Sequence, residues 1–335
     1  MGRSAVWSAV LWICVAACSV ELGIRARLWF NDPHVWDDAG LFRYKPSYQV
    51  GDAPALSTNN VGFFGDDLTL PKAASARRVF LMGDSALTNP EIPQALKSTL
   101  EERLPGRRFE VNAAGLPRYT SYHNRVLLER YLTRLEPDCI IVYLGLNDNV
   151  YNTNAKLDGE PPVGLWAWSD CSTVLALDMF WYHTVHKRFL THPQFTVLRS
   201  PSIFETHLRT IIETAQHGNI AVLLVKPAVG FPTDDPVLEE AIRNSERPMR
   251  HFWGDLDPAL RGVAAHTAAL EQLAADYRIP VVDAASVLPR TSRFFRDLCH
   301  FTSAGNVEFG RFLAEMLVSH KILSNGRPAG APDAH

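Results

Sequence analysis

Two short segments far apart in the chain carry side chains that could act together in catalysis. Gly83-Asp84-Ser85 follows an apolar run, and Asp297-Leu298-Cys299-His300 precedes the last helix-like stretch. A serine hydroxyl is a weak nucleophile at neutral pH, so His300 would have to take its proton while Asp297 holds the imidazole in the required tautomer. Their spacing of three residues lets Asp297 and His300 lie on one side of a tight turn. These residues predict a serine hydrolase.

Two further segments offer hydrogen-bond donors for the charge that develops in such a reaction. Gly115 and Asn147, the latter within Gly145-Leu146-Asn147-Asp148, each follow a strand-like run. Attack on an ester carbonyl produces an oxyanion. We expect the backbone N–H groups of Ser85 and Gly115 and the side-chain amide of Asn147 to bind it. Each such donor typically contributes ~10² to 10³ in rate.

The four segments resemble those of the SGNH/GDSL hydrolase family, which is named for its Ser, Gly, Asn and His. In this sequence they are Ser85 in Gly-Asp-Ser, Gly115 in Asn-Ala-Ala-Gly, Asn147 in Gly-Leu-Asn-Asp and His300 in Asp-Leu-Cys-His. Asn60-Val-Gly-Phe-Phe-Gly upstream and His300-Phe-Thr-Ser-Ala-Gly downstream extend the resemblance over residues 58–318. The resemblance implies a flavodoxin-like fold and an esterase that needs no cofactor.

One departure from the family pattern follows the predicted nucleophile. The family usually has an apolar residue, then Thr and soon a Gly after its serine, whereas this chain continues with Ala86-Leu87-Thr88-Asn89. The nucleophile itself is unaffected. We expect the difference to alter the shape of the neighbouring acyl pocket.

Two aspartates lie beside predicted site residues. Asp84 precedes Ser85, and Asp148 follows Asn147. Short polar side chains commonly satisfy nearby backbone donors in loops. We therefore expect both carboxyl groups to bind loop backbone rather than to take part in the reaction.

Strand-like and helix-like segments alternate along the chain. Strand-like runs lie at 78–82, 109–113, 139–144, 220–225 and 279–283, and helix-like runs lie near 91–104, 120–135, 203–217, 259–277 and 303–319. The alternation predicts a three-layer α/β/α sandwich with a central parallel five-stranded sheet. Ser85, Gly115 and Asn147 fall just past strand ends, where open sheets bind ligands. An apolar stripe along 303–319 predicts that this helix packs on the sheet and fixes the turn before it.

Two stretches, 150–200 and 227–258, interrupt the alternation. The first is rich in aromatic residues: Trp166, Trp168, Phe180, Trp181 and Tyr182. These rings could line a sugar or acyl site, face a bilayer, or form a small satellite core beneath a long loop. His183, His186 and His192 in the same stretch are too loosely spaced to indicate a metal site.

Length and composition agree with one globular domain. The chain has 335 residues, of which 47% are hydrophobic and 21% charged, so it can bury a substantial core. A net charge of -3 with dispersed Lys and Arg gives no basic stripe. Nucleic acid is therefore not an expected partner.

The N-terminus differs in kind from the rest of the chain. Residues 4–24 are almost wholly apolar or small apart from Glu21, a length that suits a membrane span or a secretion signal. An uncleaved anchor, a cleaved signal, and a lipoprotein signal that uses Cys18 all remain open. We expect an N-terminal segment 1–27, a hydrolase-like domain 28–323, and a disordered tail 324–335. The family resemblance together with this leading segment implies a membrane-anchored domain outside the cytoplasm.

The five cysteines give little guidance. Cys139 begins a strand-like run, where burial is expected, and a disulfide between Cys171 and Cys299 beside the predicted catalytic turn is one open possibility. No cluster with finger-like spacing indicates a metal.

These observations together predict an esterase that removes a short acyl group, such as acetyl, from a small molecule or an envelope glycan. An acyltransferase that passes the acyl group from the same serine to a polysaccharide is the first alternative, because water and a sugar hydroxyl differ only as second nucleophile. A non-catalytic carbohydrate-binding or assembly protein on the same fold is the other, because fold does not fix function.

Overall fold

The structure is a computed structural model of the chain. It describes residues 12, 15, 16, 19, 20, 34–36, 42–49, 57–150, 201–253 and 255–323. The chain divides into two compact units, Met1–Phe42 with Glu160–Thr191, and Arg43–Gly159 with His192–His335. All five predicted site residues lie in the second unit.

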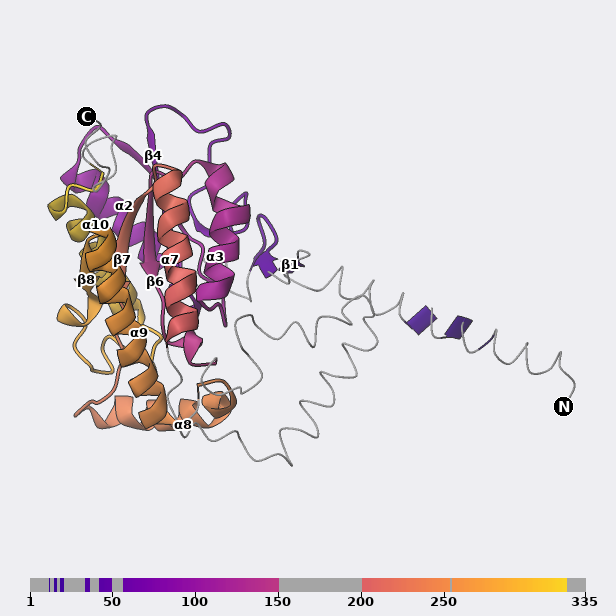
Figure 1. Cartoon of the computed structure of the whole chain (residues 1–335), viewed down its shortest axis with the longest axis vertical. Coiled ribbons are helices and arrows are strands. Elements are labelled where there is room, and N and C mark those ends of the chain that lie inside the picture. Colours follow the sequence, from indigo (N-terminus) through magenta and orange to yellow (C-terminus); the bar gives the residue numbers. More distant parts are fainter. Residues whose placement is uncertain are drawn as a thin grey trace, which may run out of the picture. The chain divides into compact units, whose positions relative to one another are not determined.

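A six-stranded sheet forms the centre of the second unit (Figure 1). Its strands are β3 (Phe64–Gly65), β4 (Ala76–Met82), β5 (Arg108–Ala113), β6 (Cys139–Tyr143), β7 (Ala221–Lys226) and β8 (Val281–Asp283). They lie in the order β3-β5-β4-β6-β7-β8, and every pair is parallel except β3 with β5. Two short strands, β1 (His34–Trp36) and β2 (Phe42–Tyr44), precede it in the chain. The parallel part confirms the five predicted strands.

The central strands β6 and β7 are almost wholly apolar because both faces of the sheet are covered. Every residue of β6 is buried, and so is every residue of β7 except its last, Lys226. The register pairs Val79 of β4 with Cys139 of β6, and Ile140 with Val222 of β7. Such continuous apolar runs are typical of parallel sheets with helices on both faces.

The antiparallel edge strand β3 was not predicted, so the expectation of five strands is one short. β3 has only two residues, which is too few for a visible alternation of polar and apolar side chains. Asn59 holds the segment in place, because its side-chain amide donates to Asp66 O and to Asn112 Oδ1, both at 2.7 Å.

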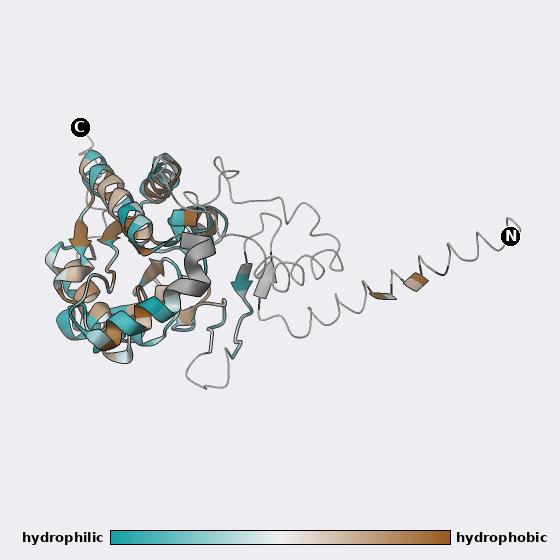
Figure 2. Ribbon diagram, turned by 90° about the horizontal axis from the view of Figure 1, so that it is seen from below, coloured by the Kyte–Doolittle hydropathy of each residue, from teal (hydrophilic) through white to brown (hydrophobic). Residues whose placement is uncertain are grey.

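Six helices of the described residues surround the sheet. They are α2 (Glu91–Arg103), α3 (Ser121–Arg130), α7 (Ser202–His217), α8 (Pro236–Trp253), α9 (Leu256–Tyr277) and α10 (Ser303–Ser319). Helices α2 and α10 pack together on one face, and α3, α7 and α9 cover the other (Figure 1). Hydrophobic and hydrophilic residues alternate along the helices (Figure 2), and the buried residues are mostly apolar. The predicted three-layer α/β/α fold is thereby confirmed.

Helix α8 occupies much of the stretch 227–258 that we predicted to be an interruption. Asp235 begins it, since its carboxylate accepts from the backbone N–H of Val237 at 2.9 Å. Leu238 and Ile242, one turn apart, are buried. Pro248 within the segment is a residue that usually ends a helix, which obscured the helical pattern.

Helix α10 packs on the sheet as predicted. Phe309 is fully buried, and its ring lies 5.1 Å from that of Tyr143 on β6. Gly310 allows α10 to approach α2 closely, because a Cβ at this position would lie 2.5 Å from the carbonyl oxygen of Ile92. The helix therefore gives the preceding turn a rigid support.

Three predicted segments lie wholly or mostly outside the described residues. These are the apolar N-terminal segment, the aromatic stretch at 150–200 and the tail at 324–335. None of the helices that the structure does describe combines the length and apolar character needed to cross a membrane.

Candidate active site

Ser85, His300 and Asp297 form one hydrogen-bonded line. His300 Nε2 lies 2.9 Å from Ser85 Oγ, and His300 Nδ1 lies 2.8 Å from Asp297 Oδ2 and 3.0 Å from Oδ1. The structure thus brings together two segments that are 215 residues apart in the chain. This is the arrangement in which a base can deprotonate a serine while a carboxylate orients the base.

Ser85 lies in a tight turn at the carboxyl end of β4. It begins a single 3₁₀ turn, Ser85–Leu87, which Asp84 caps by accepting from the backbone N–H of Ala86 at 2.9 Å. Burial raises the pKa of Asp84 to about 6 despite this hydrogen bond and the nearby charge of His300. The prediction that Asp84 binds loop backbone is confirmed.

The turn that carries Asp297 and His300 is held by backbone contacts on both sides. Phe295 and Phe301 pair across it in an antiparallel bridge, and Gly230 N–H donates to Leu298 O at 2.8 Å. Within the turn, Asp297 Oδ1 accepts from the backbone N–H groups of Cys299 at 3.0 Å and His300 at 2.9 Å. These backbone contacts therefore fix the carboxylate of Asp297 independently of its contact with the imidazole.

The charge state of Asp297 sets the tautomer of His300. Burial raises the pKa of Asp297, but the hydrogen bonds and charge of His300 and the N–H of Cys299 outweigh it, so the pKa is lowered overall. An ionised carboxylate can only accept hydrogen bonds, so Nδ1 of His300 carries the imidazole proton. Nε2 is left as an acceptor that faces the Ser85 hydroxyl.

Gly115 lies directly against the turn that carries Ser85. A Cβ at Gly115 would lie 2.6 Å from Asp84 O and 2.8 Å from Cβ of Leu87, so any side chain would push the two loops apart. Within the described part of the chain, no hydrogen bond uses the backbone N–H of Ser85 or of Gly115. These two donors are thus available to a ligand.

Asn147 lies at the same edge of the sheet, in the 3₁₀ turn Asn147–Asn149 after β6. It is 3% exposed, and its side-chain nitrogen donates to Tyr119 O at 3.0 Å. Tyr119 lies in the loop after β5, the same loop that contains Gly115. This hydrogen bond fixes the orientation of the Asn147 side chain at the edge of the sheet.

Asp148 ties the turn with Asn147 to the start of helix α3. The carboxyl group accepts from the backbone N–H and the hydroxyl of Ser121, whose oxygen also lies 3.0 Å from Nδ1 of His207. Burial raises the pKa of Asp148 to about 7 in spite of the Ser121 hydrogen bonds. Asp148, like Asp84, binds loop backbone as predicted.

Sequence patterns did not single out two buried residues that hold the same loops. Asn124 of α3 donates to Gly83 O at 3.0 Å and to Thr120 O at 2.9 Å. The Nδ1 atom of His266, from α9, lies 2.6 Å from Gly145 O. A lone polar residue on an apolar helix face has no distinctive spacing, and only the tertiary contacts show its part in positioning the site.

Replacing Asn147 by Ala is expected to lower kcat by ~10² to 10³ with a much smaller change in KM, because a donor to the oxyanion acts mainly on the transition state. Steady-state kinetics on a small activated acetate ester measure both constants, and circular dichroism checks the fold. A variant with normal kcat and a raised KM would instead make Asn147 a substrate-binding residue.

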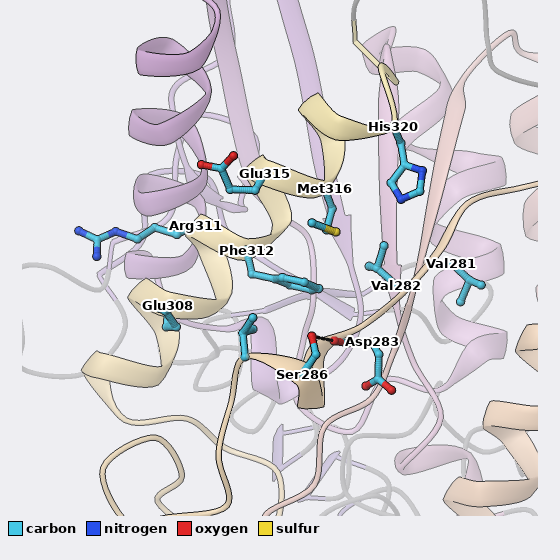
Figure 3. A pocket seen from close by; sticks show the side chains of 11 residues that line it. Val281, Val282, Asp283, Ser286, Glu308, Arg311, Phe312, Glu315, Met316 and His320 are labelled. Atoms are coloured by element: carbon cyan, nitrogen blue, oxygen red, sulfur yellow. Dashed lines mark hydrogen bonds between the residues drawn. The ribbon is translucent and has the colours of Figure 1, made fainter.

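Two hollows that the described residues form lie away from Ser85. The larger, of about 750 Å³, lies between β8 and α10 (Figure 3). Its walls include Val282 and Asp283 of β8 and Phe312 and Met316 of α10. The second hollow is lined mainly by residues 232–235 and 288–291.

Cys299 is a buried free thiol in the catalytic turn. Its Sγ atom lies 3.6 Å from Nδ1 of His300. Burial raises the pKa of this thiol well above its usual value, and the charges of Asp297 and Asp84 act in the same direction. Cys171, the other member of the possible disulfide, lies outside the described residues, so that pairing stays a hypothesis.

Comparison with known families matches residues 63–307 to the model described as "GDSL-like Lipase/Acylhydrolase family". This range includes all five predicted site residues. Comparison with the curated proteins finds no match.

Several solved structures are similar over most of their length. A lipase/acylhydrolase from Enterococcus faecalis is 19% identical, with 73% of this chain and 96% of that chain covered and a TM-score of 0.45. A carbohydrate acetylesterase from Sinorhizobium meliloti is 14% identical, with 73% and 99% covered and a TM-score of 0.46. An aryl esterase from M. smegmatis is 18% identical, with 72% and 99% covered and a TM-score of 0.46.

Proposed function

This chain belongs to the GDSL-like lipase/acylhydrolase family, and from that premise we propose that it cleaves a short acyl ester, with Ser85 as nucleophile, His300 as base and Asp297 as the carboxylate that orients the base. Membership of the family makes the chain a serine hydrolase that acts on ester bonds. The hydrogen-bonded line from Ser85 Oγ through His300 to Asp297 is the observation that carries the proposed roles.

In the proposed reaction the Ser85 hydroxyl oxygen attacks the ester carbonyl while its proton passes to Nε2 of His300. The tetrahedral intermediate collapses when His300 returns that proton to the leaving alcohol, which departs and leaves an acyl group on Ser85. Water then repeats the sequence: His300 deprotonates it, the oxygen attacks the acyl carbon, and Ser85 is released with its proton restored. Asp297 stabilises the imidazolium in both halves.

The negative oxygen of each intermediate is bound by the backbone N–H groups of Ser85 and Gly115 and the amide of Asn147. The close contact of Gly115 with the Ser85 turn supports this assignment, because it holds the two loops that carry these N–H groups against each other. The Asn147–Tyr119 bond supports it as well, because a donor held in advance needs no reorganisation during the reaction.

The substrate we propose is an acetyl or other short acyl ester, carried by a small molecule or by an envelope glycan. The family match supports an acyl ester as the substrate. Rates measured on a series of esters of one alcohol with increasing acyl length test this choice. A steady rise in kcat/KM toward long acyl chains would refute it.

Turnover without an acceptor separates a hydrolase from an acyltransferase. A hydrolase admits water to the acyl-enzyme, so we expect steady release of acetate from an activated ester and covalent labelling of Ser85 by a fluorophosphonate. A transferase would show a burst, then slow release that an acceptor sugar accelerates. Acceptor-dependent formation of acetylated sugar with negligible free acetate would favour the transferase. Failure of both labelling and turnover would favour a binding protein.

The place we propose for the enzyme is the outer side of a membrane, anchored by residues 1–27. The apolar run at 4–24 is long enough to span a bilayer, and the site residues all lie in the remainder of the chain. We expect the full chain to sediment with membranes and a chain lacking 1–27 to be soluble and active. Cys18→Ser should not release the full chain, and release by this substitution would point to a lipid on Cys18.

A further inference from the structure

Three metal-binding side chains meet in the turn that precedes α10. The carboxylate of Asp297, Sγ of Cys299 and Nδ1 of His300 offer ligand atoms that all lie within 4.8 Å of one another. Cys299 is buried, whereas the side chains of Asp297 and His300 are 20% and 27% exposed. The cluster therefore has an inner sulfur and an outer side open to solvent.

We propose that this cluster is an inhibitory site for thiophilic divalent cations such as Zn²⁺ and Cd²⁺, with Asp297, Cys299 and His300 as three ligands and water as the fourth. The proposed function requires only Asp297 and His300 in the turn. The side chain of Cys299 takes no part in the proposed reaction, yet it completes a ligand set of the kind that zinc prefers.

The spacing of the sulfur and nitrogen fits a tetrahedral ion. Bond lengths of about 2.3 Å for Zn–S and 2.0 Å for Zn–N imply a sulfur to nitrogen distance of about 3.5 Å at a tetrahedral centre. Cys299 Sγ and His300 Nδ1 lie 3.6 Å apart. The carboxylate oxygens lie 2.8 and 3.0 Å from Nδ1 and within 4.8 Å of Sγ, so the Asp297 side chain would have to turn to bring both separations to the roughly 3.3 to 3.5 Å of a tetrahedral centre.

Metal binding at this place would stop the reaction through the histidine tautomer. A neutral imidazole that binds an ion through Nδ1 carries its proton on Nε2, which then faces Ser85 as a donor and cannot accept the serine proton. The proton balance is simple: the thiol proton leaves to solvent as the Cys299–metal bond forms, and the imidazole proton is transferred from Nδ1 to Nε2 by way of solvent. His300 is thereby lost as a base, although its contact with Ser85 persists.

The choice of ion follows from the sulfur ligand. Thiolate favours Zn²⁺, Cd²⁺ and similar ions, whereas Mg²⁺ and Ca²⁺ prefer six or more oxygen ligands, which a turn with one carboxylate does not supply. We therefore expect Zn²⁺ and Cd²⁺ to inhibit and Mg²⁺ and Ca²⁺ to have no effect.

The first test measures inhibition in the full chain and in single cysteine variants. Zn²⁺ should inhibit both turnover of an acetate ester and fluorophosphonate labelling of Ser85, and a chelator should restore both. Cys299→Ala and Cys299→Ser should keep basal activity and lose at least about 10- to 100-fold in sensitivity, the loss that even outer partners of metal ligands cause. Cys139→Ala is the matched control, because Cys139 is also a buried free cysteine but begins β6, and it should remain as sensitive as the native chain.

The second test measures binding without activity, in a chain that already carries Ser85→Ala. Co²⁺ should produce thiolate-to-cobalt charge-transfer absorption, and the added Cys299→Ser change should remove the part of that absorption due to this site. This binding would persist even if Ser85 were not the nucleophile, so failure of the proposed function and failure of the metal site are distinguishable. Equal Zn²⁺ inhibition of the native chain and both Cys299 variants, or a cobalt spectrum unaffected by Cys299→Ser, would overturn the proposal.

Discussion

Replacing Ser85 by Ala is expected to reduce kcat for a small activated acetate ester by about 10⁶-fold, the loss measured when the serine of a catalytic triad is removed. A methyl group cannot attack a carbonyl, and no other hydroxyl is hydrogen-bonded to Nε2 of His300 among the described residues. The variant should still fold, because Ala is smaller than Ser and the capping hydrogen bond, which the backbone N–H of Ala86 donates to Asp84, does not involve the Ser85 side chain.

His300→Ala should be about as severe as Ser85→Ala, because members of a triad act as a unit. Ser303→Ala is a suitable control, since Ser303 lies three residues beyond His300, is exposed, and donates to Glu91 instead of the site. It should leave kcat unchanged. Appreciable activity in the Ser85 variant would remove the nucleophile assignment, and near-normal activity in the His300 variant would require another base.

The sequence was a good guide to the strands that position the site because each is a continuous apolar run followed by a distinctive polar segment. The parallel strands β4, β5 and β6 begin and end within two residues of the predicted runs. Parallel strands of one open sheet end at a common edge. Ser85, Gly115 and Asn147 could therefore be placed near one another without knowledge of any contact.

Two elements of the fold were missed because their causes are not local. β3 exists because the amide of Asn59 and the edge of β5 order a two-residue strand. Helix α8 forms although Pro248 argues against it, and its buried face includes Leu238 and Ile242. In both cases tertiary contacts outweigh weak local preferences.

The supporting contacts of the site were equally beyond prediction. Ser121, Asn124 and His266 hold the loops after β4 and β6 through buried hydrogen bonds to residues 27, 41 and 121 positions away. Nothing in their spacing distinguishes them from other polar residues on helices. Sequence motifs identify the residues that react. The residues that hold them in place are identified only from tertiary hydrogen bonds between the loops.

Asp297→Asn should lower kcat by about 10⁴-fold, although Asn matches Asp closely in shape. In the native turn Oδ1 accepts from two backbone N–H groups, and Oδ2 is nearest to Nδ1 of His300. The single oxygen of Asn must take the place of Oδ1 to satisfy those donors, so its NH₂ group takes the place of Oδ2 and donates to Nδ1. The imidazole proton then resides on Nε2, and His300 cannot deprotonate Ser85.

This mechanism makes the isosteric substitution as harmful as truncation. Asp297→Ala removes the orienting carboxylate but does not impose a tautomer on His300. If Asp297 only shaped the turn, Asp297→Asn would lower kcat much less than Asp297→Ala. Asp283→Asn serves as the matched control, because Asp283 pairs with Lys226 on the exposed end of β8. Steady-state kinetics on one acetate ester give kcat for all three variants, and thermal unfolding checks that their stabilities are similar. If Asp297→Asn retains more than about a tenth of native kcat while Asp297→Ala loses 10⁴-fold, Asp297 shapes the turn and does not set the histidine tautomer.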